Sequence, residues 1–278
     1  MLIKIFPVLA FLISISGCID GKKVSSFQDS NEAENVDLLS KAIVEDEEFC
    51  GYDKLNDVFM NETSEDVRLV RSAYLSSYNL RTKCPNYVSW KLNSKRLEKN
   101  VKRSDRFNED KDIDEDYRIT HSDYSRSGYD RGHMCPAADN RYDAVAMEEC
   151  FLMTNMCPQT RRLNAGDWND LEELCRNWAE AGIDVYIVCG PIFSASSSRS
   201  IGGQGRKISV PDSFFKVVLL NDANEYNAIG FIMNNNDDSR DLSEYIVSVD
   251  LVEEITGYDF FHNLPDDIES VIEKLEEM

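Results

Sequence analysis

Residues 129–136 read Tyr129-Asp130-Arg131-Gly132-His133-Met134-Cys135-Pro136, and this stretch anchors the interpretation of the whole chain. It places a carboxylate, a guanidinium, a glycine and an imidazole in consecutive positions of a chain with only three histidines. An imidazole moves protons near neutral pH, and a guanidinium can hold a phosphate through paired hydrogen bonds. A glycine between them allows a tight turn or a close approach to a ligand. Four residues alone identify no chemistry, so the interpretation depends on the stretches that follow.

The N-terminus has the pattern of an export signal. Lys4 precedes an apolar run from Ile5 to Ile15, which is too short to span a bilayer and suits the hydrophobic region of a signal peptide. The run leads into Ser16-Gly17-Cys18, which resembles the lipobox of bacterial lipoproteins, in which the cysteine is lipidated. We therefore expect a signal peptide over residues 1–17, a lipidated Cys18 and a location at the bacterial cell envelope. An ordinary cleaved signal with an incidental cysteine is the alternative.

The rest of the chain divides into a polar segment and a folded body. Residues 18–48 are rich in Ser, Asn, Asp and Glu, which is typical of a flexible acidic tether. Residues 49–278 are expected to form one domain, because a hydrophobic content of 42% and an aromatic content of 10% allow a sizeable core.

Cysteine usage leaves the disulfide pattern open. If Cys18 carries lipid, seven of the eight cysteines remain, and an odd number leaves at least one free or paired between chains. Export permits disulfides, and the absence of a C-x-x-C pair argues against a zinc ribbon. The remaining cysteines are Cys50, Cys84, Cys135, Cys150, Cys157, Cys175 and Cys189.

The formal net charge of −21 argues against a nucleic-acid partner, because a polyanion repels an acidic surface. Much of the acid, however, lies near the ends, in residues 20–48 and 237–277, and the middle is richer in arginine. A bound divalent cation would add positive charge where it is needed. The charge therefore predicts weak non-specific binding at high salt and does not exclude nucleic acid.

The apolar spacing predicts strands and helices without regular β-α alternation, which favours an α+β fold over a parallel α/β sheet. Strands are expected over residues 67–80, 87–92, 185–189, 214–220, 226–233 and 245–249. Helices are expected over residues 144–153 (running into a strand), 168–182, 251–256 and 266–277. The strand over 185–189 is expected to stop at Gly190-Pro191, and residues 104–115 are expected to form a loop.

Two further polar stretches follow the first. Residues 154–159 read Thr-Asn-Met-Cys-Pro-Gln, and residues 163–172 read Leu-Asn-Ala-Gly-Asp-Trp-Asn-Asp-Leu-Glu. Asn164 offers a neutral oxygen to a hard cation such as Mg²⁺, which keeps several waters and needs few protein ligands; a helix cap is its alternative role. If one helix included both residues, Glu172 would lie roughly 12 Å from Asn164, so it suits a bond to a water on the metal better than direct coordination.

Taken in order, the three stretches resemble the sugar-non-specific DNA/RNA endonucleases of the endonuclease G type. Members share a D-R-G-H stretch, a T-N-x-x-P-Q stretch and an L-N-x-G-x-W-x-x-L-E helix start, and the resemblance covers about residues 67–264. It implies a ββα-metal active-site core within a mixed, largely antiparallel sheet flanked by helices. It also implies a Mg²⁺-dependent hydrolase, with Mn²⁺ as the alternative metal, that cleaves DNA and RNA with little sequence preference and leaves 5′-phosphate ends.

The resemblance assigns roles to four residues. His133 is expected to be the general base that takes a proton from the attacking water. Asn164 is expected to be the single direct metal ligand. Arg131 is expected to stabilise the phosphorane, and Asn155 is expected to orient the phosphate or the waters on the metal.

Other positions keep two interpretations. Glu172 is expected to act through a water on the metal, and Glu173 is its alternative. Asp130 is expected to fix the histidine loop, in either a structural or a catalytic role. Arg103 or Arg106 corresponds to a family arginine near the phosphate, although the register slips there by one residue.

Four residues are expected to stay outside the chemistry. Cys135 and Cys157 depart from the family pattern, and either thiol could only tune the site. His121 and His262 lack the polar, glycine-punctuated surroundings of His133 and are expected to be structural or surface residues.

Two other functions are weighed against the nuclease. One is a non-catalytic envelope module that binds nucleic acid or protein, and the other is a metal phosphodiesterase for small nucleotides. A zinc nucleobase deaminase is disfavoured, because the paired His-x-Glu and Pro-Cys-x-x-Cys motifs are absent. Members of the resembling family often dimerise, so a homodimer is among the expected partners.

Overall fold

The computed structural model describes residues 53–195, 198–203 and 206–275. Contacts divide the chain into Met1–Ile43 and Val44–Met278, and all described residues belong to the second unit. The expected signal peptide, the lipidated Cys18 and the tether therefore lie outside the described residues. Within the described ranges, no helix is long and apolar enough to cross a membrane.

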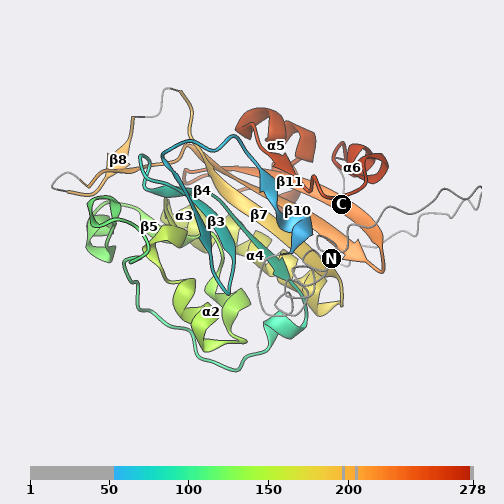
Figure 1. The fold of residues 1–278 in the computed structure, drawn as a ribbon, viewed down its shortest axis with the longest axis horizontal. Helices are drawn as coiled ribbons and strands as arrows, with labels where there is room; N and C mark the ends of the chain where they lie inside the picture. The colour runs from blue at the N-terminus through green and yellow to red at the C-terminus, as the bar shows by residue number, and fades with distance from the viewer. Residues whose placement is uncertain (1–52, 196–197, 204–205, 276–278) are drawn as a thin grey trace, which may run out of the picture. The chain divides into compact units, whose positions relative to one another are not determined.

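A seven-stranded sheet forms the centre of the second unit (Figure 1). Its strand order is β12-β11-β10-β7-β4-β3-β2, and every neighbouring pair is antiparallel. The strands are β2 Asp66–Val70, β3 Leu75–Asn79, β4 Cys84–Leu92, β7 Asp184–Ile192, β10 Ser213–Asp222, β11 Glu225–Asn234 and β12 Ile246–Val247. The α+β fold with a largely antiparallel sheet is thus confirmed.

Shorter elements surround this sheet. Three small two-stranded sheets pair β1 Val58–Phe59 with β13 Asp259–Phe260, β5 Asp130–His133 with β6 Met156–Gln159, and β8 Ser200–Ile201 with β9 Ile208–Ser209. The α-helices are α2 Ala144–Glu149, α3 Arg161–Ala165, α4 Asp167–Glu180, α5 Val249–Thr256 and α6 Asp266–Ile272. Short 3-10 helices are η1 Lys54–Asn56, η2 Lys95–Leu97, η3 Glu115–Tyr117, η4 His121–Tyr124, η5 Ala137–Asn140, η6 Met153–Asn155 and η7 Leu242–Tyr245.

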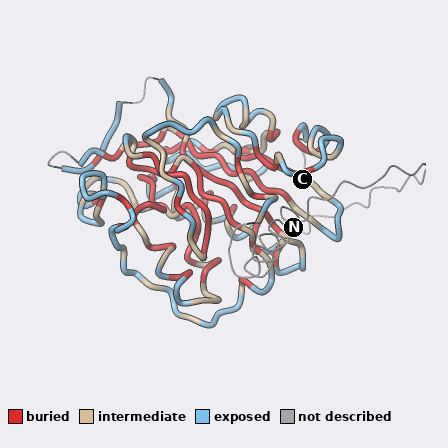
Figure 2. Tube along the Cα trace, viewed as in Figure 1, coloured by how far each residue is buried: buried red, intermediate tan, exposed pale blue. Residues whose placement is uncertain are grey.

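The sheet is buried on both faces, as Figure 2 shows by its buried central strands. Along β7, Val185, Ile187 and Cys189 enter a core that also contains residues of α4, whereas Tyr186 and Val188 enter a second core under α5 and α6. Side chains alternate across a strand, so each strand supplies both cores. This explains why the central strands are apolar runs without a polar face.

Local signals fix where the elements begin and end. The α4 helix turns one apolar face inward, formed by Trp168, Leu171, Cys175 and Ala179. Ser248 accepts a hydrogen bond from the backbone of Leu251 and so caps α5. Ala223 and Asn224 have φ of 52° and 73°, which suits the tight turn between β10 and β11.

Several predicted boundaries are wrong. The β7 strand does not stop at Gly190-Pro191 but continues to Ile192, paired with β10 throughout. It pairs with β4 only as far as Cys189, so the proline lies beyond that pairing, where its missing N–H costs no hydrogen bond to β4.

The predicted strand over 67–80 is two strands, β2 and β3. The short helix predicted over 144–153 is α2, but the 3-10 helix η6 follows it before the strand β6 begins. The predicted terminal helix over 266–277 ends at Ile272.

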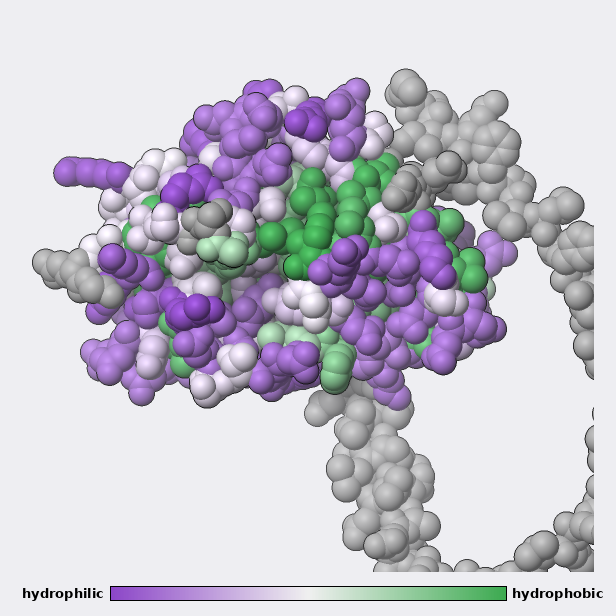
Figure 3. Space-filling model, turned by 90° about the horizontal axis from the view of Figure 1, so that it is seen from above, coloured by the Kyte–Doolittle hydropathy of each residue, from purple (hydrophilic) through white to green (hydrophobic). Residues whose placement is uncertain are grey.

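Figure 3 shows a largely hydrophilic face with one group of hydrophobic residues. Several large apolar side chains of the described residues are exposed, among them Leu251 and Ile255 of α5 and Val271 of α6. Both helices therefore pack inward against the second core and also present apolar atoms to solvent.

Candidate active site

The first two polar stretches of the sequence, residues 129–136 and 154–159, form one antiparallel hairpin, β5–β6. Asp130 lies opposite Gln159, and His133 lies opposite Met156. The ladder is extended by a bond of 3.0 Å from the backbone N–H of Met134 to the carbonyl oxygen of Asn155. The hairpin therefore fixes the direction in which the histidine strand presents its side chains.

Gly132 is required where the two strands meet. A Cβ atom at this position would lie 1.9 Å from Oε1 of Gln159, which is fully buried on the partner strand, two residues after Cys157, the residue opposite Gly132. Any side chain at residue 132 would thus displace the glutamine from the hairpin. The close approach, rather than an unusual backbone angle, explains the glycine.

The third stretch forms two helices, not one. Asn164 lies in α3 and Glu172 lies in α4, and Gly166 separates them with φ −115° and ψ −113°. The predicted helix over 168–182 is thus α4, and it does not include Asn164. The alternative role of Asn164 as its cap is wrong, because the N-cap residue of α4 is Gly166. A Cβ at Gly166 would lie 2.6 Å from the carbonyl oxygen of Arg162, so the break requires a glycine.

The hairpin and the two helices together line one polar pocket. Its lining residues are Arg103, Phe107, Asp130, Arg131, His133, Asn164, Asn169 and Glu172. The pocket thus brings together four predicted residues from two separate stretches of the sequence: Arg131, His133, Asn164 and Glu172.

His133 lies against two aromatic rings, with ring centroids 5.7 Å from Phe107 and 4.8 Å from Phe151. Its Nε2 atom is buried and has no hydrogen-bond partner among the described residues. Burial, followed by the charges of Arg103 and Arg131, lowers the pKa of the imidazole to about 3. The ring is therefore neutral near physiological pH and can accept a proton.

Both pocket arginines stack on those same rings. The guanidinium carbon of Arg131 lies 4.5 Å from the centroid of Phe107, and that of Arg103 lies 5.4 Å from the centroid of Phe151. The Nε of Arg131 is buried without a partner in the described part of the chain. Stacking covers the faces of the guanidiniums and leaves their N–H edges for an anion in the pocket.

Asn164 is oriented by Asp130. Its Nδ2 donates a hydrogen bond of 3.1 Å to Oδ2 of Asp130. No bond from a described residue to its Oδ1 is present, so the amide oxygen is available to the pocket. An amide oxygen beside two carboxylates is a donor set that Mg²⁺ accepts, so the residues present fit a hard cation.

Glu172 is held from behind by an ion-pair chain. Its Oε2 lies 3.9 Å from Nη1 of Arg176, which also lies 3.1 Å from Oδ1 of Asp139. Burial raises the pKa of Glu172 to about 7, although Lys216 and Arg176 act in the opposite direction. Glu173 is exposed and does not line the pocket, so the geometry favours Glu172 over its alternative.

Asn155 is not in the pocket. Its side chain is fully buried, accepts a bond from the backbone N–H of Cys135 and donates to the carbonyl oxygens of Cys135 and Cys150. The predicted contact with phosphate or with waters on the metal is therefore not supported by its position. Asn155 instead ties the end of the histidine strand to the residue that follows α2.

The structure also shows where the other residues lie whose roles the sequence left undecided. Arg103 lines the pocket, whereas Arg106 lines a different surface hollow. Cys135 and Cys157 are buried and absent from the pocket lining. His121 is exposed, and His262 lies near Asp57, with a nitrogen-to-oxygen distance of 4.0 Å.

Sequence reasoning missed Phe107 and Asn169 and left Arg103 undecided. Phe107 comes from the charged segment over 104–115 that was expected to be a loop, and Arg103 directly precedes that segment. Both face the site through tertiary packing that no local spacing reveals. Asn169 could have been found, because it lies one residue after Trp168 on the first turn of α4.

Comparison with known proteins adds an independent result. The family described as DNA/RNA non-specific endonuclease matches residues 53–267. A nuclease of Nostoc sp. is 37% identical over 222 residues, covering 76% of this chain and 79% of the relative. The mitochondrial endonuclease G of Homo sapiens is 31% identical over 205 residues, covering 70% of this chain and 69% of the relative.

A solved structure agrees with this result. The crystal structure of the EndoG/EndoGI complex, which is described as showing the mechanism of EndoG inhibition, contains a chain that aligns with a TM-score of 0.66 and 29% identity. The alignment covers 71% of this chain and 86% of that chain.

Proposed function

The chain belongs to the DNA/RNA non-specific endonuclease family and is an enzyme that hydrolyses nucleic acids, and from this we propose a Mg²⁺-dependent mechanism in which His133 is the general base and Asn164 the metal ligand. The observation that carries the proposal is the shared pocket of His133, Asn164 and Arg131. Mn²⁺ is the alternative metal. The products would be 5′-phosphate ends.

His133 would take a proton from the attacking water. A ring with a pKa of about 3 is a weak base in the free enzyme, because burial and two guanidiniums disfavour its protonated form. A phosphodiester in the pocket brings a negative charge that offsets those guanidiniums, so its arrival raises the basicity of the ring. General-base assistance of this kind typically contributes ~10²–10⁴-fold in rate.

Arg131, with Arg103 beside it, would hold the phosphate. Arg131 has an unpartnered buried Nε and makes no ion pair with a described carboxylate, so a bound anion would satisfy it. Fixed donors aimed at the reacting phosphate stabilise the charge that builds up in the transition state. Arg103 is half-exposed and would reach the same anion from the rim.

Asn164 would hold the metal through Oδ1, with Asp130 keeping the amide in that orientation and Glu172 facing the ion from α4. When bound, the cation would supply positive charge to the phosphate and to the leaving oxygen. The raised pKa of Glu172 fits this arrangement, since an adjacent cation would favour the carboxylate. Asn155 would act as a positioning residue behind the hairpin.

Plasmid cleavage tests this mechanism. The full chain, freed of metal, should nick and linearise supercoiled plasmid and degrade RNA only after MgCl₂ is added, and EDTA should stop both reactions. Asn164→Ala should need far more Mg²⁺ than wild type. Equal rates with and without EDTA would contradict the metal dependence.

The same assay separates the alternatives. A non-catalytic binding module would retain plasmid in a gel-shift experiment without cutting it in any divalent metal. A small-nucleotide phosphodiesterase would cleave a cyclic dinucleotide and spare plasmid. The pocket favours the endonuclease because base, phosphate-binding and metal-binding groups are all present in one place.

We also propose that Cys18 anchors the enzyme to the cell envelope through lipid. The support is the short apolar run that ends in Ser16-Gly17-Cys18. Labelling with a radioactive fatty acid should mark the protein, and Cys18→Ala should abolish the label. A label that survives in Cys18→Ala would rule this anchor out.

A further inference from the structure

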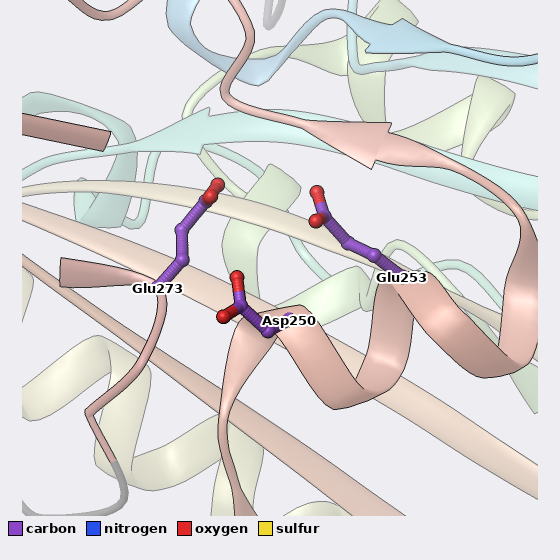
Figure 4. Close-up of side chains that lie close together, drawn as sticks. All are labelled: Asp250, Glu253 and Glu273. Carbon is purple, nitrogen blue, oxygen red and sulfur yellow. The ribbon is translucent and has the colours of Figure 1, made fainter. Parts of the chain in front are cut away.

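A second group of carboxylates lies apart from the pocket, in the helices that cover the other face of the sheet. Asp250 and Glu253 belong to α5, and Glu273 follows the last turn of α6. One oxygen of each lies within 4.8 Å of the others. Figure 4 shows the three carboxylates directed toward a common space between the two helices.

The backbone holds these side chains together. Asp250 and Glu253 are three residues apart on a helix and so share a face. The backbone N–H of Asp250 donates a bond of 3.2 Å to the carbonyl oxygen of Glu273. Glu253 accepts a bond of 2.8 Å from the backbone N–H of Phe260. The cluster is thus fixed by contacts that do not depend on the carboxylates meeting one another.

Glu273 is the member that most needs an additional partner. The residue is only 6% exposed, and its Oε1 is buried with no hydrogen-bond partner in the described part of the chain. A buried carboxylate without a partner is costly unless it is neutralised or coordinates a cation. Its unpartnered oxygen is therefore independent support for a ligand at this place.

No positively charged side chain of the described residues forms an ion pair with these three carboxyl groups. None of the ion pairs formed by the described residues includes Asp250, Glu253 or Glu273. Burial first, and then neighbouring carboxylates that include Asp259 and Glu269, raise the pKa of Glu273 to about 9. Burial likewise raises the pKa of Glu253 to about 7. A cation in the space between the helices would favour the ionised form of both carboxyl groups.

We propose that Asp250, Glu253 and Glu273 bind a hard divalent cation of the Ca²⁺ type, at a site separate from the catalytic centre. Ca²⁺ takes oxygen ligands at roughly 2.3–2.6 Å in flexible geometry, so one ion can bridge oxygens at the observed separation, and water can complete its shell. The ion would join the start of α5 to the end of α6. It would thereby hold both helices on the second core, which contains Val252 and Ile272.

Calorimetry on the full chain tests the site directly. The metal-free chain, solubilised in detergent, is titrated with CaCl₂ and compared with Glu273→Gln. The matched control is Glu254→Gln, an exposed carboxylate of the same helix that lies outside the cluster. We expect Glu273→Gln to lose one Ca²⁺-binding event that wild type and Glu254→Gln keep, or to bind that ion at least tenfold more weakly. The same binding in all three chains, or no binding in any, would overturn the proposal.

Thermal unfolding separates a ligand from a merely structural residue. In EDTA, Glu273→Gln should unfold at the same temperature as wild type or higher, because a neutral amide never carries the cost of a buried, unpaired carboxylate. CaCl₂ should raise the Tm of wild type and of Glu254→Gln but leave that of Glu273→Gln unchanged. A Ca²⁺-dependent rise in Glu273→Gln equal to that of wild type would contradict the site, and so would a Tm that falls in EDTA.

The site does not depend on the nuclease mechanism. Glu273→Gln should therefore cleave plasmid in Mg²⁺ at the wild-type rate. A loss of cleavage with Ca²⁺ binding intact would count against the separation of the two sites.

Discussion

At the scale of the residue, the site works through the surroundings of a single imidazole. His133 lies against two aromatic rings, and the charges that lower its pKa, after burial, are guanidiniums. This arrangement keeps the ring neutral and leaves Nε2 without a partner. The basicity of the ring then depends on whether an anion occupies the pocket, which couples proton transfer to substrate binding.

The pH dependence of kcat/KM should change when one of the two guanidiniums near His133 is removed. Because the folded-state pKa of His133 is lowered, the neutral base persists as pH falls below 6.5 and is lost only on approach to about 3. Removing a nearby positive charge raises that pKa, so Arg103→Met should move the acidic limb of kcat/KM to higher pH. Arg106→Met is the control, because Arg106 does not line the pocket. An acidic limb that moves equally in both variants would contradict this assignment.

Metal affinity should depend on Asp130. This carboxylate accepts from Nδ2 of Asn164 and so fixes the direction of Oδ1. Residues that orient a metal ligand typically contribute about 10- to 100-fold in metal affinity or activity, so Asp130→Ala should raise the half-saturating Mg²⁺ concentration by that order. Asp170→Ala, an exposed carboxylate on α4, should leave the Mg²⁺ requirement unchanged. An unaltered requirement in Asp130→Ala would show that Asn164 needs no orienting partner.

At the scale of the element, the chemistry depends on a hairpin followed by two short helices. The β5–β6 ladder aims the histidine, and the break at Gly166 turns α3 and α4 so that Asn164 and Glu172 reach one pocket. The motifs predicted that these residues meet. They did not predict the break between α3 and α4. Its cause is the contact between a Cβ at residue 166 and the carbonyl oxygen of Arg162, which the local sequence pattern does not show.

The close approach of Gly132 to Gln159 in the hairpin can be tested with two substitutions, the second of which should rescue the first. Gly132→Ala would place a methyl group on the side chain of Gln159, and such overpacking typically costs ~1–3 kcal/mol and would misdirect His133. Both side-chain polar atoms of Gln159 are buried without partners in the described chain, so Gln159→Ala removes no hydrogen bond there. The double variant should recover Tm and plasmid cleavage toward wild type. A double variant as impaired as Gly132→Ala would exclude the steric explanation.

At the scale of the whole molecule, one sheet separates two sites. The pocket lies on the core shared with α4, and the carboxylate cluster lies on the core shared with α5 and α6. The apolar runs predicted β4, β7, β10 and β11 well, because long buried strands leave a strong local signal. Arg103 and Phe107 were not predictable in the same way, since their segment is charged and irregular and reaches the site only through packing.

The cysteines provide a test of the fold as a whole. Export suggested disulfides, but all six cysteines in the described residues are free and buried. The unfolded, never-reduced chain should therefore release at least those six thiols to a thiol reagent, and reduction should leave Tm unchanged. Fewer thiols, or a Tm that falls on reduction, would show that bridges form among them. These six cysteines are Cys84, Cys135, Cys150, Cys157, Cys175 and Cys189.

The most direct test of the account compares two histidine variants in plasmid cleavage with saturating Mg²⁺. His133→Ala should lose ~10²–10⁴-fold in rate while keeping its Tm and its binding of uncut plasmid. His121→Ala, which removes an exposed imidazole outside the pocket, should cleave at the wild-type rate. Wild-type cleavage by His133→Ala would contradict the central claim that this imidazole is the general base.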